Sequence, residues 1–258
     1  MSGIHPAAIV SPDARLEEDV EIGPYAVVGP GVHLSRGTVV GSHAVLEGPA
    51  HFGEGNRVYP HAVLGLGPQD LKYKGEPTRL TVGVRNVFRE FTTVHRGTPT
   101  GTAETVIGDE NYFMSGSHVG HDGRVGSRCV FANGASIAGH VEVGDHVVLS
   151  GFSGAHQWVR IGSFAFVGGY TPLRQDTLPF CKTDGVDAKT YGLNTIGLKR
   201  NGFSEERIDA LQRAYRLLVK SKLNTTQALE RIEAEIPDQP DVRELVDFIR
   251  GSKRGFHK

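Results

Sequence analysis

The chain has 258 residues and a nearly balanced charge, with 28 lysines and arginines against 29 aspartates and glutamates. This balance gives no support for nucleic acid or an anionic membrane surface as a partner. Its two cysteines are too few for a disulfide framework and favour a reduced, cytoplasmic setting, and no stretch approaches the roughly 18 apolar residues of a membrane span. The first residues also lack the basic and apolar regions of a signal peptide, so we expect neither export nor a membrane span.

An apolar residue recurs at every sixth position from Ile4 to Leu64. A period of six fits neither an amphipathic helix nor a straight alternating strand, whereas it fits a chain that turns a corner every six residues. Three such units would close one triangular coil of about 18 residues. The sequence therefore predicts a mainly β protein, a parallel β-helix of hexapeptide repeats, and its 34 glycines suit the tight corners.

The repeat is interrupted over 66–79 and again over 96–105, and it resumes at Ile107 with a shift of one residue. We expect both interruptions to be loops ejected from the solenoid, and such loops commonly build its binding face. From Ile107 the period continues without a break to Val167. Among the histidines of this stretch, three lie in the two short runs 117–122 and 138–140: His118, His121 and His140.

Beyond Leu173 the repeat decays and a helical period replaces it. Ser204 is expected to cap a first helix, a second should carry Leu229 and Ile232, and a third should follow Pro240. We therefore expect a β-helix domain over 1–190 and a C-terminal helical domain over 191–258. The start of the helical domain is basic, which is either a solvated face or a dock for an acidic partner. Its cations are Lys199, Arg200, Arg207, Arg213, Arg216, Lys220 and Lys222.

The three histidines suggest a chemical centre. Residues 18 apart stack on adjacent coils, which places His121 beneath Gly139 and beside His140. An imidazole can take a proton from a hydroxyl, and a backbone N–H can hold the charge that develops on an attacked thioester. Two alternatives stay open at this point, a structural scaffold and a zinc site. Zinc would need His140 or a neighbouring chain beside His118 and His121, and no carboxylate-rich surroundings of that type are evident.

Several segments together resemble the UDP-N-acetylglucosamine O-acyltransferase family. They are residues 69–79, 95–98, 118–122, 138–140, 156–157 and 197–200. The resemblance implies a left-handed coil and transfer of an (R)-3-hydroxyacyl chain from acyl carrier protein to the 3-hydroxyl of UDP-N-acetylglucosamine, the first step of lipid A biosynthesis. It further implies a homotrimer with the active site between chains, and no cofactor or metal beyond the phosphopantetheine on the donor protein.

The resemblance also assigns roles. His121 would be the general base, Asp122 would assist it, and the Gly139 amide would hold the oxyanion. Neighbouring strand residues point to opposite faces, so a contact between His121 and Asp122 requires a corner between them. The residues implied in substrate binding are Gln69, Asp70, Lys72, His95, His118, His140, His156, Gln157, Asn194 and Arg200. Acyl carrier protein is acidic and would suit the basic helices.

Phe166 and Gly169 map to the family's acyl-chain ruler, the positions that limit the length of the bound acyl chain. A glycine at the second position predicts room for a long chain. At two positions, Ile196 and Asn201, the chain departs from the residues that many family members carry, and both positions fall near the implied nucleotide and donor contacts. N-acylation of a 3-amino UDP-sugar therefore stays an alternative, as does a zinc hydratase of the same fold. The related N-acyltransferase normally carries an extra N-terminal domain, whereas the repeats here begin at Ile4.

Overall fold

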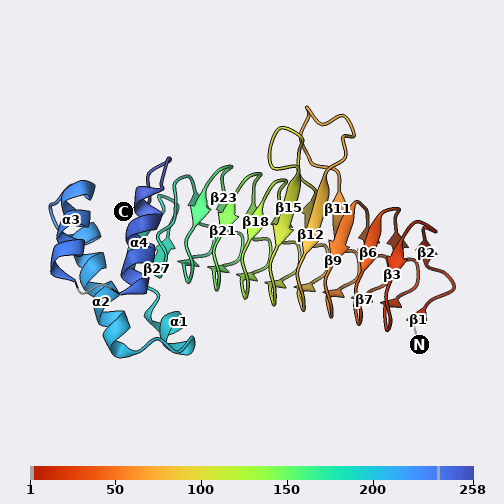
Figure 1. The fold of residues 1–258 in the computed structure, drawn as a ribbon, viewed down its shortest axis with the longest axis horizontal. Coiled ribbons are helices and arrows are strands. Elements are labelled where there is room, and N and C mark those ends of the chain that lie inside the picture. Colours follow the sequence, from red (N-terminus) through yellow and green to blue (C-terminus); the bar gives the residue numbers. More distant parts are fainter. Residues whose placement is uncertain (1–2, 237–238) are drawn as a thin grey trace.

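The computed structural model describes residues 3–236 and 239–258 as a long solenoid that ends in a group of helices (Figure 1). In the described residues, twenty-eight short strands form three sheets, here named A, B and C, and each coil up to β24 contributes one strand to each sheet. All strand pairs are parallel except the last, between β27 and β28. The predicted parallel β-helix with a helical C-terminal domain is confirmed.

The strands of the three sheets are as follows. Sheet A holds β1 (Gly3–Ile4), β4 (Glu21–Ile22), β7 (Val39–Val40), β10 (Arg57–Val58), β13 (Val87–Phe88), β16 (Tyr112–Phe113), β19 (Val130–Phe131), β22 (Val148–Leu149), β25 (Phe166–Val167), β27 (Cys181–Asp184) and β28 (Lys189–Leu193). Sheet B holds β2 (Ile9–Val10), β5 (Val27–Val28), β8 (Val45–Leu46), β11 (Val63–Leu66), β14 (Thr93–His95), β17 (His118–Val119), β20 (Ser136–Ile137), β23 (Gly154–Ala155) and β26 (Pro172–Leu173). Sheet C holds β3 (Arg15–Leu16), β6 (Val32–Leu34), β9 (Ala50–Phe52), β12 (Arg79–Val82), β15 (Glu104–Ile107), β18 (Arg124–Val125), β21 (Glu142–Val143) and β24 (Arg160–Ile161).

The period of six decides which side chains are buried. Residues 18 apart pair directly, as Val119 does with Ile137, and both side chains are fully buried. The ring of Phe88 stacks on Phe113 with centroids 4.9 Å apart, and Phe113 packs at a tilt against Phe131 with centroids 4.8 Å apart. Hydrophobic burial along this single continuous core stabilises the coil.

The sheets meet at three corners, named A/B, B/C and C/A. The second residue of each tight corner has a positive φ, for example 55° at Phe152 on A/B, 56° at Asp122 on B/C and 58° at Phe164 on C/A. Such angles are uncommon for residues with a Cβ. They turn the side chain out along the edge, so that corner side chains of successive coils stack on one another, as Phe152 does on Tyr170.

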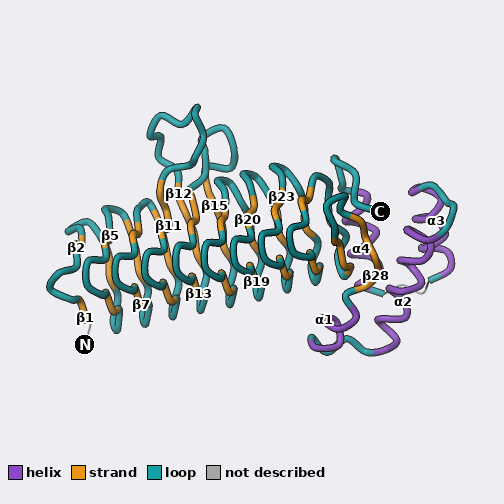
Figure 2. Tube along the Cα trace, turned by 180° about the vertical axis from the view of Figure 1, so that it is seen from behind, coloured by secondary structure: helices purple, strands orange, loops and turns teal. Residues whose placement is uncertain are grey.

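Both ejected loops leave from the B/C corner. The first joins β11 in sheet B to β12 in sheet C over 67–78, and the second joins β14 to β15 over 96–103. The two loops project side by side from the same edge of the solenoid (Figures 1 and 2). This edge also carries His121 and His140, so the loops rise next to the histidine cluster.

The helical region consists of α1 (Thr195–Arg200), α2 (Glu205–Tyr215), the π-helical turn η1 (Arg216–Lys220), α3 (Thr225–Glu235) and α4 (Pro240–Arg250). The expected caps are present, since Ser204 accepts from the Arg207 amide and Pro240 begins α4. Helix α1 was not predicted. Sheet A continues to Leu193, but side chains from Leu178 onward already pack into the helical core. None of the described helices combines the length and apolar character needed to cross a bilayer.

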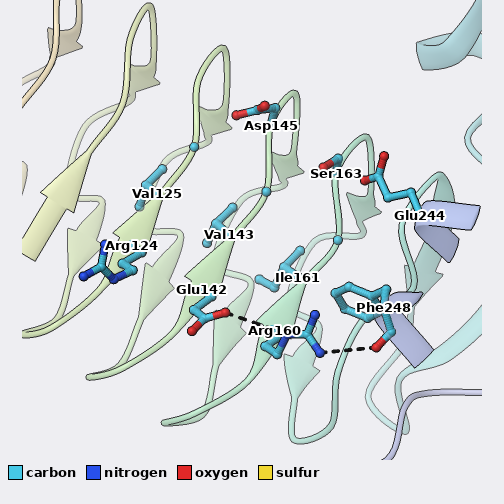
Figure 3. A pocket seen from close by; sticks show the side chains of 13 residues that line it. Arg124, Val125, Glu142, Val143, Asp145, Arg160, Ile161, Ser163, Glu244 and Phe248 are labelled. Atoms are coloured by element: carbon cyan, nitrogen blue, oxygen red, sulfur yellow. Dashed lines mark hydrogen bonds and ion pairs between the residues drawn. The ribbon is translucent and has the colours of Figure 1, made fainter. Parts of the chain in front are cut away.

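Helix α4 docks on the outer face of sheet C. There the Arg160 guanidinium lies 4.3 Å above the Phe248 ring and donates a 3.2 Å hydrogen bond to the Phe248 carbonyl. Glu142 lies 3.7 Å from the same guanidinium (Figure 3). A hollow of about 390 Å³ opens beside this junction, and Glu244 lies on its rim. Because Arg160 is already engaged by α4 and Glu142, we interpret this hollow as part of the domain junction.

Candidate active site

His121 and Asp122 form a hydrogen-bonded pair at the B/C corner. The Nδ1 of His121 lies 2.8 Å from Oδ2 of Asp122. The corner that this contact requires is present, because Asp122 has a φ of 56° and its side chain turns back toward the imidazole. An ionised carboxylate only accepts hydrogen bonds, so this contact places the imidazole proton on Nδ1 and leaves Nε2 as a proton acceptor.

The second ejected loop holds Asp122 in place. Thr98 donates to the carboxylate through its amide at 3.0 Å and its hydroxyl at 2.7 Å, and the Thr102 amide donates at 2.8 Å. The Asp122 side chain is completely buried. Burial alone would raise the pKa of Asp122, but the hydrogen bonds from Thr98, His121 and Thr102 together outweigh it and lower that pKa. The loop therefore keeps a buried negative charge behind the imidazole.

Gly139 lies directly against the face of His121. A Cβ at position 139 would come within 2.6 Å of the His121 Nε2, so a larger residue would displace the ring. Among the backbone hydrogen bonds of residues 3–236 and 239–258, none has the Gly139 amide as donor. A free amide next to the basic nitrogen of an imidazole is the arrangement that an oxyanion site needs.

His140 and Trp158 extend the cluster along the corner. The His140 ring meets His121 edge-on at 5.0 Å and stacks on Trp158, with centroids 3.8 Å apart and planes 5° apart. Burial lowers the pKa of His140, and the nearby charges of Asp122 and Asp70 only partly oppose this effect. His140 is therefore a neutral hydrogen-bonding group near pH 7.

His95 and His118 lie on sheet B beside this corner. Their rings meet edge-on at 5.2 Å, and His118 Nδ1 lies 2.8 Å from the Thr93 hydroxyl. Burial, followed by the neighbouring charges of His118 and His121, lowers the pKa of His95 to about 4. Burial also lowers the pKa of His118. These two rings are thus uncharged near neutral pH, and they border the cluster without a direct hydrogen bond to His121.

The first ejected loop brings Gln69, Asp70 and Lys72 to the same edge. Gln69 and Lys72 are exposed, while Asp70 is half-buried and accepts a 2.9 Å hydrogen bond from the Lys72 amide. Asp70 is also close enough to His140 to raise its pKa. These side chains are therefore accessible to a ligand at the corner.

His156 and Gln157 continue the B/C corner on the next coil. Both side chains are exposed. His156 Nδ1 lies 3.1 Å from the Gln157 carbonyl oxygen, and Arg254 of the C-terminal tail approaches the same nitrogen to 3.5 Å. Together with His121, Gly139 and His140, they form one row along the B/C corner.

The remaining expected site residues lie on the other two corners. Gly169 is at the A/B corner, and Phe166 precedes it on the outer face of sheet A. Asn194 is at the C/A corner, where its amide nitrogen donates to the Phe164 carbonyl and its oxygen caps α1. Arg200 is exposed at the end of that helix. Within one chain these residues do not converge with His121, so they share a site with it only if chains assemble.

The two residues that depart from the family pattern, Ile196 and Asn201, lie at helix α1. Ile196 is 69% exposed in the first turn of the helix. Asn201 follows the helix, and its side-chain amide donates a 2.8 Å hydrogen bond to the Gly197 carbonyl. Asn201 thus stabilises the C-terminal end of α1.

The expected basic face is smaller than the sequence indicated. Arg207 forms two 2.7 Å hydrogen bonds to Asp241 and lies over the Phe203 ring, so it clamps α2 to α4. Arg213 donates to the Glu235 carbonyl at 2.6 Å. These two arginines therefore make contacts within the helical domain, although Arg213 stays exposed.

A metal would find potential ligands in His121, Asp122 and His140, whose ligand atoms lie within 4.8 Å of one another. However, the Asp122 oxygens are already occupied by donors from Thr98, Thr102 and His121. A cation would have to displace these contacts, so the donor set fits a catalytic pair better than a metal site.

Sequence reasoning missed three residues that shape this cluster. Thr98 and Thr102 hold Asp122, and Trp158 supports His140. The register of the coil could have revealed Trp158, which is 18 residues after His140. Pattern alone could not place the threonines, because the second loop follows no period.

A parallel β-helix of hexapeptide repeats with a histidine corner and two overhanging loops defines a hexapeptide-type transferase. Residues 13–48 match the family described as bacterial transferase hexapeptide (six repeats), and residues 176–257 match domain 2 of UDP-N-acetylglucosamine O-acyltransferase. The chain is 54% identical over 256 residues to the acyl-[acyl-carrier-protein]–UDP-N-acetylglucosamine O-acyltransferase of Alkalilimnicola ehrlichii, covering 99% of both chains.

Solved structures of the same family have the same fold as this chain. The UDP-N-acetylglucosamine acyltransferase of Bacteroides fragilis superimposes with a TM-score of 0.96 at 36% identity, covering 98% of this chain and 99% of that one. The O-acyltransferase of Moraxella catarrhalis gives 0.95 at 38% identity, covering 99% of both. The chain belongs to the UDP-N-acetylglucosamine O-acyltransferase family, and its coil is the left-handed β-helix.

Proposed function

We propose that this chain transfers an (R)-3-hydroxyacyl group from acyl carrier protein to the 3-hydroxyl of UDP-N-acetylglucosamine, the first step of lipid A biosynthesis. One observation carries the proposal: His121, oriented by the buried Asp122, presents Nε2 next to the free amide of Gly139. A base and an oxyanion donor side by side are what acyl transfer to a hydroxyl requires.

The reaction follows from this geometry. Nε2 of His121 takes the proton of the sugar hydroxyl as the hydroxyl oxygen attacks the thioester carbonyl. The buried charge of Asp122 stabilises the imidazolium that forms. The Gly139 amide donates to the oxygen of the tetrahedral intermediate. When the C–S bond breaks, the imidazolium returns the proton to the leaving thiolate, and His121 is neutral again.

The other residues would bind and align the substrates. Gln69, Asp70 and Lys72 on the first loop, with His95, His118 and His140, would surround the sugar, and His156 with Gln157 would contact the donor side. Asn194 positions α1, which would present Arg200 to a ligand. Phe166 and Gly169 would line the end of the acyl groove.

The functional unit would be a homotrimer. Gly169 and Arg200 lie on corners different from that of His121, so a site that uses all of them must combine corners of different chains. The cations that remain exposed on the helical domain, among them Arg200, Arg216 and Lys222, would receive the acidic acyl carrier protein. The setting is cytoplasmic, and no cofactor is needed beyond the donor's phosphopantetheine.

Acyl transfer by wild-type and His121→Ala protein tests the proposal. With 3-hydroxyacyl carrier protein and UDP-N-acetylglucosamine, we expect transfer by wild type and a loss of kcat of about 10²–10⁴-fold in the variant. His5→Ala, an exposed histidine at the far end of the solenoid, is the matched control and should retain activity. Wild-type transfer only to a 3-amino sugar, or activity that depends on zinc, would instead support the alternatives.

A further inference from the structure

Two histidines on adjacent coils face each other on the outer face of sheet C, toward the N-terminal end of the solenoid. His33 on β6 is in register with His51 on β9 (Figure 1), and their Nδ1 atoms lie 3.0 Å apart. His33 is half-buried, whereas His51 is exposed. The two nitrogens therefore meet at one place on the surface.

Glu17 fixes the proton of the His33 ring. Its Oε1 lies 2.8 Å from His33 Nε2, and its Oε2 accepts a 3.2 Å hydrogen bond from the Arg36 amide. These two hydrogen bonds, first that of His33, lower the pKa of Glu17, so the carboxylate is ionised at neutral pH. Because a carboxylate only accepts hydrogen bonds, neutral His33 carries its proton on Nε2 and a lone pair on Nδ1. A carboxylate behind an imidazole in this way is typical of histidines that bind metals.

His51 supplies a second nitrogen beside the first. Burial, followed by the charge of His33, lowers the pKa of His51, so its ring is uncharged at neutral pH. With its proton on Nε2, the Nδ1 of His51 also carries a lone pair. Metal–nitrogen bonds are about 2.0–2.1 Å long, which places two nitrogens bound at a right angle ~2.9 Å apart. The 3.0 Å between the two Nδ1 atoms matches this spacing, and without an ion it is a hydrogen bond from His51 to His33.

The charges around the pair favour a cation. An open hollow of about 510 Å³ beside Glu17 is also lined by Glu18, Glu54 and Arg36. Arg36 is paired with Glu54 at 3.5 Å, and the other neighbouring cation is Arg15, which is in register with His33. Three carboxylates therefore face two arginines, and this excess of negative charge attracts cations.

The outer face of sheet C is polar and suited to contact with water. Farther along the same face, Arg124 and Glu142 occupy outward positions (Figure 3). Sheet B instead presents Val27, Val45 and Val63 outward on the coils near the histidine pair. Assembly of chains that buries apolar surface would use sheet B and leave the histidine pair in solvent.

We propose that His33 and His51 bind a divalent transition-metal ion such as Ni²⁺ or Cu²⁺ through their Nδ1 atoms, with Glu17 orienting His33. Imidazole nitrogens suit these ions, and a right angle between two ligands fits their tetragonal geometry. Water would complete the coordination on the exposed side. The bound ion would link two adjacent coils of the solenoid. This site is separate from the catalytic corner and does not depend on the proposed function.

Equilibrium dialysis of the full chain against Ni²⁺ at neutral pH tests the site. We expect wild type to bind the ion, His33→Gln and His51→Gln to lose it, and Glu17→Gln to bind it about 10–100-fold more weakly. His61→Gln is the matched control and should bind like wild type. His43 and His61 also lie on adjacent coils, but their rings stack face to face with planes 11° apart, so their in-plane lone pairs do not converge.

Thermal unfolding separates a lost ligand from a misfolded chain. Without metal, the variants at positions 33 and 51 should melt like wild type. With excess Ni²⁺ the Tm of wild type and His61→Gln should rise, because the ion binds only the folded site, and the Tm of His33→Gln and His51→Gln should not. An equal rise in all four proteins would contradict the proposal.

Three dialysis results would overturn the site. The first is no binding by wild type, or binding that survives both His33→Gln and His51→Gln. The second is loss of the ion in His140→Gln but not in His33→Gln, which would place the ion at the catalytic corner. The third is displacement of Ni²⁺ by excess Mg²⁺, which prefers oxygen ligands and would point to the glutamates alone.

Discussion

The Nδ1 of His121 lies 2.8 Å from Oδ2 of its sequence neighbour Asp122, although adjacent residues of a straight strand face opposite sides. The corner between sheets B and C makes this contact possible, because the positive φ of Asp122 rotates its side chain back. Two threonines of the overhanging loop complete the carboxylate's hydrogen bonds. The solenoid corner and the loop together fix which nitrogen of His121 can accept a proton.

Replacing Asp122 by Asn should impair catalysis far more than folding. The neutral amide would still fill the space, but it would no longer stabilise the imidazolium or fix the proton on Nδ1. We expect kcat to fall about 10²-fold or more, measured with both substrates saturating. Asp145→Asn is the control, because Asp145 also accepts a backbone amide at a corner, far from His121 along the coil perimeter. An unchanged kcat in Asp122→Asn would refute this role.

Trp158 is the only tryptophan of the chain, so its fluorescence reports on His140. A protonated imidazole stacked on an indole quenches its emission. Burial lowers the pKa of His140, so the ring should stay neutral until the pH falls below about 6.5. A fluorescence titration should therefore show quenching with a midpoint below that value. His140→Gln should abolish the transition, and a midpoint above the ordinary histidine range would contradict the burial argument.

The repeat made most of the fold predictable. One apolar residue in six determines the coil, its register and its core, and the spacing of 18 residues per coil is sufficient to place His121 against Gly139 and His140. Helix α1 was not predicted because it has only six residues and a single buried side chain, Leu198. One buried residue gives no periodic apolar pattern in the sequence.

The parts of the site that come from outside the repeat were not predictable. The positions of Thr98 and Thr102 depend on how a non-periodic loop closes over the corner. Arg207 resembled a surface cation in sequence, but its partner Asp241 is on a different helix, and no local pattern links the two. Long-range polar pairing is specified by tertiary packing and leaves no periodic signal.

The buried His95 should make folding stability depend on pH. Its pKa is about 4 in the folded chain, whereas an unfolded histidine titrates near 6.5. The unfolded state therefore binds a proton first as the pH falls, so the contribution of neutral His95 is complete above about pH 6.5 and is lost toward pH 4. Between pH 7 and pH 5 we expect the unfolding free energy of wild type to fall by about 2 kcal/mol more than that of His95→Gln.

Urea unfolding at the two pH values, at one fixed protein concentration, measures this difference. His43→Gln is a suitable control because His43 is exposed on the A/B corner and should leave the wild-type pH dependence unchanged. Identical pH dependence in His95→Gln and wild type would show that His95 takes up its proton equally in the folded and unfolded chain.

A methionine at position 169 should shorten the preferred acyl chain. Gly169 has no positive φ, and a Cβ there would meet only the Gly151 carbonyl oxygen at 3.3 Å, so the backbone can accept a side chain with a small adjustment. The longer side chain would then project from the exposed corner into the space that we assign to the end of the acyl chain.

A series of 3-hydroxyacyl carrier proteins measures the effect. Gly169→Met should lose kcat/KM for the longest donor and retain or gain it for shorter ones. In such a pocket one or two methylenes are worth roughly 10–200-fold each. Because donors are compared within one variant, a general loss of folding lowers all of them equally and does not imitate a shift. An unchanged ranking of donors would mean that the groove ends elsewhere than at Gly169.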